Sequence, residues 1–353
     1  MLQNDFMNSK CPFNIALPVL TILAVCPGIE VEAREILSAE QETCIIELIR
    51  TAPDRLTMGE ARAMCETEIV EAEGSNAGGQ AGPPTGIAEN RLSADQENIL
   101  RPFTMMVHRN NYILLGAHNF MGYDAEPYES AYNQSDINAD DTEVQFQLSL
   151  KMPLAVDLFD RKIDIFAGYT VKSFWQVYNT EESSPFRETN YEPEIWLQVR
   201  PELEIVGFKN TVSGIGINHM SNGEGGPLSR SWNRLFATLA FERGNFVFAL
   251  KPWVRIEEDA ETDDNPDITD YFGHGELLTA YKHGRHTFSL MTRNNVESGF
   301  STGAIELGWS FPLFTYPYLK GYVQYFSGYG ESLIDYDHYV NRIGIGLQFA
   351  DIL

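Results

Sequence analysis

The chain has 353 residues, of which 43% are hydrophobic and 21% charged, a composition typical of a folded protein. Its formal net charge of −25 argues against nucleic-acid binding, because neutralising phosphates requires an excess of Lys and Arg. Aromatic residues are abundant, with 16 Tyr and 21 Phe, and this favours many strands and tight turns over a bundle of helices.

The N-terminal segment has the features of an export signal. Lys10 precedes an apolar run from Pro12 to Cys26, which is short for a membrane-spanning helix. Val31-Glu32-Ala33 then offers a cleavage site that ends in a small residue. We therefore predict that residues 1–33 are a signal peptide removed after Ala33. A buried helix or a membrane anchor is the alternative interpretation.

Removal of that peptide would leave two cysteines, Cys44 and Cys65. An even number of cysteines in an exported chain favours a disulfide. We predict that residues 34–70 form a small helical extension, with two short helices around Pro53, stapled by this bond. Residues 71–97 are rich in Gly, Pro, Ser, Asn and Ala, and we predict that they form a flexible linker.

Residues 98–353 contain roughly twelve segments of about ten residues with alternating polarity, separated by turn residues, which is the pattern of an outer-membrane barrel. In the last segment, for example, Ile343 and Ile345 alternate with Gly344 and Gly346. We therefore expect an all-β fold, a twelve-stranded antiparallel transmembrane β-barrel. A soluble sandwich would show the same alternation, but the export signal and the aromatic content favour the barrel. The predicted strands lie near 103–117, 143–156, 161–177, 194–205, 211–221, 231–243, 245–257, 269–282, 285–296, 302–311, 317–329 and 340–350.

Two of these predicted strands carry a set of polar residues suited to hydrolysis. Residues two apart on a strand share a face, so Ile217, His219 and Ser221 form one row. Asn233 has the parity of Leu235 on the next strand, and a hairpin would place it on the same outward face. Polar groups facing lipid are costly unless they have a function, and a serine hydrolase requires a hydroxyl, an imidazole and a group that orients the ring. A polar rim above the hydrocarbon boundary is the alternative.

Four sequence blocks make this region recognisable: Glu181–Pro193, Asn218–Leu235, Thr262–Thr269 and Tyr325–Tyr336. Together they resemble the outer membrane phospholipase A family of Gram-negative bacteria, over roughly residues 103–353. The resemblance implies a twelve-stranded barrel in the outer membrane. It also implies a catalytic triad in which Ser221 is the nucleophile, His219 the general base and Asn233 the residue that orients it.

The same resemblance implies calcium and a homodimer. Ser229 and the carbonyl of Glu224 match the family's calcium ligands, and Ser183 matches the ligand supplied by the partner subunit. Asp264 matches a residue tied to a second calcium site, near which Gly226 replaces an acidic residue. The implied activity is calcium-dependent hydrolysis of acyl esters of membrane phospholipids and lysophospholipids, with A1 and A2 specificity, activated by dimerisation. A non-catalytic outer-membrane barrel or porin is the alternative.

Overall fold

The computed structural model describes residues 86–99, 104–135, 137–159, 163–201, 203–314, 316 and 318–351. The predicted signal peptide (1–33), the stapled extension (34–70) with Cys44 and Cys65, and residues 71–85 of the predicted linker lie outside the described residues. Among the described helices, none combines the length and the apolar character needed to cross a membrane.

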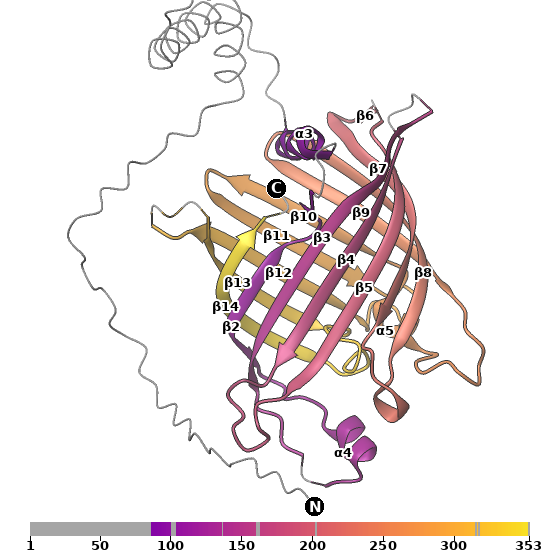
Figure 1. The fold of residues 1–353 in the computed structure, drawn as a ribbon, viewed down its shortest axis with the longest axis vertical. Helices are drawn as coiled ribbons and strands as arrows, with labels where there is room; N and C mark the ends of the chain where they lie inside the picture. Colours follow the sequence, from indigo (N-terminus) through magenta and orange to yellow (C-terminus); the bar gives the residue numbers. More distant parts are fainter. Residues whose placement is uncertain are drawn as a thin grey trace, which may run out of the picture. The chain divides into compact units, whose positions relative to one another are not determined.

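The described chain forms a closed antiparallel β-barrel (Figure 1). Each barrel strand pairs with the barrel strands that precede and follow it in the chain, including β3 with β4. The pairing of the last strand, β14, with β2 closes the sheet. The two-residue strands β1 (Met106–Val107) and β6 (Glu204–Ile205) pair only with β3 and β7, respectively, and are not part of the closed ring. The prediction of twelve barrel strands is thereby confirmed: β2 (Asn111–Asn119), β3 (Thr142–Leu158), β4 (Ile163–Trp175), β5 (Phe186–Val199), β7 (Phe208–Ser221), β8 (Ser231–Arg243), β9 (Phe246–Ile256), β10 (Gly275–His283), β11 (His286–Asn294), β12 (Gly303–Pro312), β13 (Lys320–Gly328) and β14 (Val340–Ala350).

Side chains on each strand alternate between an apolar outer face and a polar lumen. On β14, Ile343 and Ile345 are 46% and 61% exposed, whereas Arg342 and Gln348 are buried. In a soluble sandwich the apolar residues would be the buried ones. An exposed apolar belt around a polar interior is the arrangement of a barrel whose wall faces lipid.

Buried ion pairs cross the lumen. Arg187 pairs with Glu143 at 3.0 Å and with Asp335 at 2.6 Å, and the guanidinium of Arg342 pairs with Glu331. A buried charge requires a partner of opposite sign, so each of these arginines faces a carboxylate from another segment of the chain. Charged side chains that are paired in this way therefore extend into the interior.

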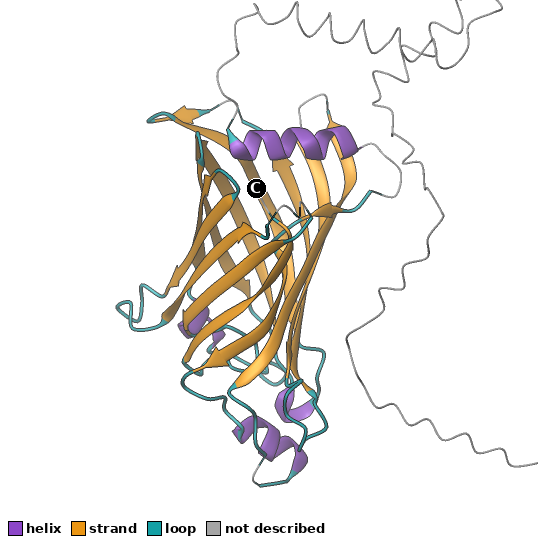
Figure 2. Ribbon diagram, turned by 90° about the vertical axis from the view of Figure 1, so that its left-hand side faces the viewer, coloured by secondary structure: helices purple, strands orange, loops and turns teal. Residues whose placement is uncertain are grey.

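The two ends of the barrel differ. Helix α3 (Ile87–Ile99) and the end of β14 lie at one end, and helix α4 (Glu126–Tyr132) lies at the other (Figures 1 and 2). At the α3 end, β8 and β9 are joined by residues 244–245 and β10 and β11 by residues 284–285. At the α4 end the connections are longer, including residues 222–230 and 257–274. Outer-membrane barrels have short periplasmic turns and long extracellular loops, which indicates that the α4 end faces outward.

The predicted flexible linker (71–97) is wrong in its C-terminal part, because residues 87–97 belong to α3. This stretch contains neither Gly nor Pro. The Glu242 carboxylate accepts hydrogen bonds from the Ala88 and Glu89 backbone N–H groups at the helix N-terminus, at 2.8 and 3.3 Å. Lys151 pairs with Asp95 at 2.8 Å nearer its C-terminus. These tertiary contacts stabilise the helix, and the absence of Gly and Pro from residues 87–97 permits it.

Three predicted strand boundaries also require correction. The first strand, predicted over 103–117, begins only at Asn111 as β2, after the two-residue β1. The fourth strand, predicted over 194–205, spans Phe186–Val199, because the polar residues at its start face the lumen and are buried there. The strand predicted over 269–282 begins only at Gly275. Before it, Ile268–Phe272 form the short helix α5, which buries the side chains of both end residues. In sequence, the polar lumen-facing residues at the start of β5 look like those of a loop. The single helical turn of α5 looks like the beginning of a strand.

Candidate active site

His219 and Asn233 lie directly opposite each other on β7 and β8. His219 Nδ1 and Asn233 Oδ1 are 2.9 Å apart, at hydrogen-bond distance. Both side chains are half-buried, while Ile217 and Leu235 in the preceding pair are 55% and 40% exposed on the outer face. The structure therefore brings the imidazole and the carboxamide together on the apolar outer wall.

Ser221 continues the His219 row at the last position of β7, opposite Ser231 on β8. It is half-buried and two residues from His219, as strand parity requires. The described contacts include no hydrogen bond between the two side chains. Catalytic hydrogen bonds often tighten only when substrate is bound, and the shared row keeps the hydroxyl and the imidazole as neighbours.

A fourth polar side chain, Glu258, joins this group and was absent from the sequence prediction. Its Oε1 accepts a hydrogen bond from Asn233 Nδ2 at 2.9 Å. Glu258 lies two residues beyond Ile256, the β9 residue that pairs with Asn233, and is half-buried. Its position continues the outward row of Val254 and Ile256, but the contact with Asn233 also depends on the register between β8 and β9. The predicted strand ended at residue 257.

The loop between β7 and β8 is organised by the buried side chain of Asn222. Its Oδ1 accepts hydrogen bonds from the backbone N–H groups of Glu224, at 3.3 Å, and Arg230, at 3.1 Å. Its Nδ2 donates to the Leu228 carbonyl at 2.7 Å. These bonds fold residues 222–230 around one side chain and include the short 3₁₀ helix η2 (Gly226–Leu228). Glu224 and Ser229 are therefore placed on one ordered loop beside Ser221.

Gly226 begins η2 with a φ of +63°, a left-handed conformation that glycine adopts readily. The family resemblance implies an acidic residue at this position, where the chain has glycine. The backbone of this loop therefore favours the glycine that the chain contains.

A second loop, residues 257–267, lies against the first. The hydroxyl of Ser229 donates a hydrogen bond to Asp264 Oδ2. The buried Asn265 accepts one from the Ser231 backbone N–H at 2.9 Å. At the end of this loop, Asp267 accepts a hydrogen bond from the Tyr336 hydroxyl, and burial raises the pKa of Tyr336, which keeps the phenol protonated as a donor. Ser229 and Asp264 thus come together from different loops.

These residues supply oxygen atoms, the donors that calcium prefers. The hydroxyl of Ser229 touches a carboxylate, and the exposed Glu224 adds a carbonyl and a second acidic group on the same loop. No three His, Cys, Asp or Glu side chains within the described ranges are grouped so that they would hold a metal ion by themselves. The donor set therefore fits calcium through hydroxyl and carbonyl oxygens together with Asp264.

Ser183 belongs to a different loop, the one between β4 and β5. It is exposed and has a φ of +62°. No described contact joins it to Ser229 or Asp264. Its exposed side chain is accessible to another molecule.

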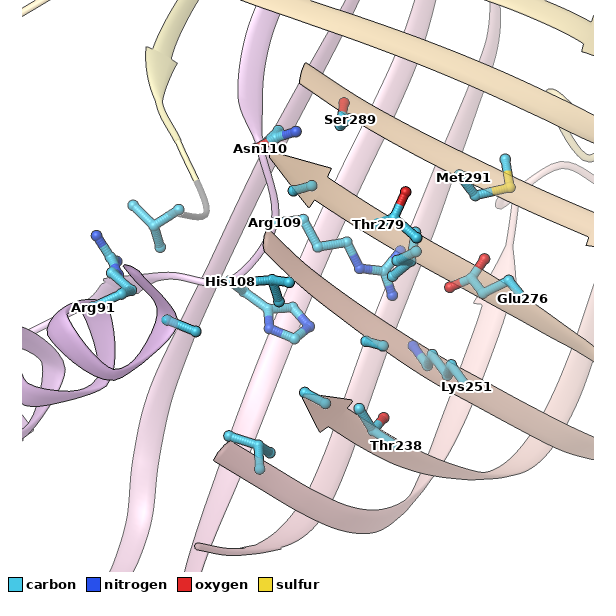
Figure 3. Close-up of a pocket in the computed structure, with 18 of the residues that line it drawn as sticks. Arg91, His108, Arg109, Asn110, Thr238, Lys251, Glu276, Thr279, Ser289 and Met291 are labelled. Carbon is cyan, nitrogen blue, oxygen red and sulfur yellow. The ribbon is translucent and has the colours of Figure 1, made fainter. Parts of the chain in front are cut away.

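The lumen contains a cavity of about 420 Å³ that is distinct from this outer site. Lys251 and Glu276 point into it from strands of the wall, and Arg109 points into it from the connection between β1 and β2 (Figure 3). Arg109 donates to both Glu192 oxygens, at 2.7 and 2.8 Å, and Lys251 pairs with Glu194 at 3.3 Å. None of Ser221, His219 and Asn233 lines the cavity, since all three have the opposite parity to the lumen-facing residues of their strands.

Comparison with known proteins identifies relatives of this barrel. A family model described as Phospholipase A1 matches residues 88–349. Phospholipase A1 of Salmonella typhimurium (strain LT2) is 41% identical over 251 residues, which cover 71% of this chain and 83% of that protein. Phospholipase A1 of Escherichia coli (strain K12) is 40% identical with the same coverage. A putative phospholipase A1 of Neisseria meningitidis serogroup B is 43% identical over 215 residues, 60% of this chain and 55% of that protein.

Solved structures show the same fold. The crystal structure of the Salmonella typhi outer membrane phospholipase, a dimer with bound calcium, matches with a TM-score of 0.66 and 40% identity, covering 72% of this chain and 94% of that chain. Outer membrane phospholipase A from Escherichia coli matches with a TM-score of 0.65 and 39% identity, covering 71% of this chain and 100% of that chain.

Proposed function

Because this chain belongs to the phospholipase A1 family of outer-membrane barrels, we propose that it cleaves acyl esters of glycerophospholipids and lysophospholipids, with A1 and A2 specificity. We assign catalysis to Ser221, His219 and Asn233. The observation that carries the assignment is the 2.9 Å contact between His219 Nδ1 and Asn233 Oδ1 on the lipid-facing wall, in line with Ser221.

The contact sets the tautomer of the imidazole. An amide oxygen only accepts hydrogen bonds, so the His219 nitrogen facing it, Nδ1, carries the proton. His219 Nε2 is then free to take the proton of the Ser221 hydroxyl. The Ser221 oxygen attacks the ester carbonyl carbon, and the resulting tetrahedral intermediate expels the alcohol, which receives the proton from Nε2. Water, deprotonated by the same nitrogen, then attacks the acyl carbon, and the bond to the Ser221 oxygen breaks as that oxygen takes the proton back from Nε2, which releases the fatty acid.

The surrounding surface suits a lipid substrate. Ile215 and Ile217 precede the catalytic row on β7 and are 53% and 55% exposed, and Val254 on β9 is 58% exposed. Acyl chains lying along these strands would place an ester near the α4 end of the barrel. Because long loops mark that end as the outer one, we infer that the enzyme attacks lipids of the outer leaflet.

We propose that calcium is held by the carbonyl of Glu224 and the hydroxyl of Ser229, together with the partner subunit's Ser183. Asp264, beside Ser229, is assigned to a second site. When bound, the cation would supply positive charge for the oxyanion of the tetrahedral intermediate. The Ser221 backbone N–H is the donor we assign to the same oxyanion. The dimer of the Salmonella typhi relative, which has bound calcium, supports activation by dimerisation.

The alternative function, a non-catalytic barrel or porin, receives less support from the lumen. Arg109, Arg187 and Arg342 extend into it, each paired with a carboxylate. A barrel of twelve strands is narrower than the sixteen-stranded porins, which have open channels.

The nucleophile is tested by Ser221→Ala. Ser213→Ala is the matched control, because Ser213 lies on the same strand at the same parity, eight residues away. With phospholipid in mixed micelles and calcium, S221A should lose at least about a thousandfold in turnover, whereas S213A should retain it. Both should keep the heat-modifiable gel migration of a folded barrel. Undiminished hydrolysis by folded S221A would contradict the assignment.

A further inference from the structure

The orienting residue assigned above is neutral, and it touches a carboxylate outside the triad. We propose that Glu258 is a positioning residue that acts on His219 through Asn233, giving the relay Ser221–His219–Asn233–Glu258. The inference rests on the proposed function. It gives the loop after β9, which carries Glu258, a role in catalysis in addition to that of the triad residues.

The register of β8 and β9 places Glu258 at this point. Asn233 pairs with Ile256, and Leu235 pairs with Val254. Val254 and Ile256 are 58% and 47% exposed on the outer face. Glu258, two residues further on, is the diagonal neighbour of Asn233 on that face, within reach for a long side chain. Its Oε1 lies 2.9 Å from Asn233 Nδ2.

The carboxylate determines how the Asn233 amide is oriented. An ionised carboxylate only accepts hydrogen bonds, so it holds the amide NH₂ toward itself and turns Oδ1 toward His219. With the amide reversed, its NH₂ would donate to Nδ1, and the neutral imidazole would carry its proton on Nε2. Nε2 could then not accept the proton of the Ser221 hydroxyl. Glu258 therefore selects the productive tautomer.

Glu258 also returns a negative charge to the relay. The imidazole becomes positively charged when it takes the Ser221 proton, and an Asp in the third position would stabilise that charge directly. Here the amide polarises between the Glu258 carboxylate and the imidazole, because chained hydrogen bonds strengthen one another at a site of low dielectric. Glu258 is half-buried, and Asn233 is the one hydrogen-bond partner that the described residues give it.

The test is a double-mutant cycle between Asn233→Asp and Glu258→Gln. In the natural background, E258Q keeps an acceptor for Asn233 but loses the charge, and kcat should fall about fivefold with KM changed less than about twofold. N233D places a second carboxylate against Glu258, and the repulsion disfavours the charged pair. In N233D/E258Q the introduced amide donates to the introduced carboxylate, and kcat should rise about tenfold over N233D alone.

The decisive observation is the direction in which E258Q changes kcat. E258Q should lower kcat in the natural background, which has Asn233, and raise kcat in the N233D background. Glu257→Gln is the control, because Glu257 is the exposed neighbour and the charge change is the same. It should produce no reversal. Equal losses in both backgrounds would make Glu258 merely structural and overturn the proposal. A weaker calcium response with unchanged kcat at saturating calcium would assign the carboxylate to the cation, and would overturn it too.

A readout without substrate separates this inference from the proposed function. The temperature at which half of the protein loses its folded gel migration should be lower for N233D and restored in N233D/E258Q. If the natural protein is active but E258Q neither raises kcat nor restores the thermal midpoint in the N233D background, the Glu258 relay alone is refuted. An inactive natural protein refutes the proposed function, and the thermal cycle then still decides whether Glu258 pairs with Asn233.

Discussion

At the residue scale, Asn222 controls the geometry of the proposed calcium loop. Truncation in Asn222→Ala leaves the backbone N–H of Arg230 and the carbonyl of Leu228 without their partner. Each lost bond costs about 1–3 kcal/mol, and the loop that presents Glu224 and Ser229 bears that cost. The calcium concentration for half-maximal hydrolysis should rise about tenfold, measured by titrating calcium against ester turnover.

Asn295→Ala is the control for this prediction. Asn295 is also buried and organises a loop: its Oδ1 accepts from the Glu297 N–H at 2.9 Å and its Nδ2 donates to the Asp270 carbonyl at 2.8 Å. Its loop joins β11 and β12 and carries none of the proposed ligands. N295A should leave the calcium midpoint unchanged, and a similar shift in both variants would mean that the effect is a general loss of order.

Strand parity predicted much of the site because it is a local property. It placed His219 and Ser221 in one row and Asn233 on the same outward face, and the register of β7 and β8 agrees. The contact of Asn233 with Glu258 depends on the register between β8 and β9 and on how far the second strand's direction continues past Ile256. Neither is encoded locally, and in sequence the acidic stretch that begins at Glu257 resembles a solvated turn.

At the element scale, α3 depends on a carboxylate from the barrel wall. Glu242→Ala removes the acceptor for the Ala88 and Glu89 N–H groups at the helix N-terminus, a loss comparable to that of an N-cap, about 0.5–2 kcal/mol. Amide hydrogen exchange of residues 87–99 should accelerate about tenfold while the barrel strands stay protected, as measured by mass spectrometry.

Lys209→Ala provides the comparison within the same helix. Lys209 pairs with Glu89 at 2.6 Å, but both side chains are largely exposed, and surface ion pairs contribute about 0–1 kcal/mol. Exchange in α3 should change less than about threefold in K209A. If K209A loosens the helix as much as E242A does, general electrostatic attraction rather than the N-terminal cap holds α3.

The boundary between linker and helix was marked in the sequence only by the loss of Gly and Pro after Gly86. Residues 87–99 have no strong amphipathic pattern, and the stabilising partners Glu242 and Lys151 lie more than fifty residues away in sequence. Strand number was easier to predict, since each crossing leaves its own alternating segment and its own turn. Strand ends were harder, because a buried polar residue in a barrel lumen looks the same in sequence as one in a loop.

At the scale of the whole molecule, the proposed site is incomplete without a second copy. Ser183 is exposed on the β4–β5 loop and has no described contact with Ser229, and we assign it to the site of the partner subunit. This division of ligands makes subunit mixing informative. In a heterodimer of S183A and S221A subunits, the S183A subunit keeps Ser221 and receives Ser183 from its partner, which restores one of two sites.

Random pairing of equal amounts makes half of the dimers mixed, so at limiting calcium such a mixture should recover about a quarter of the natural activity, well above either variant alone. The doubly substituted S183A/S221A chain gives the reciprocal prediction. Paired with a natural subunit, it supplies no Ser183 to the one intact nucleophile, and the mixed dimer should respond poorly to calcium. If Ser183 served its own subunit instead, the S183A and S221A mixture would recover nothing, and the natural subunit would keep full activity beside the double variant.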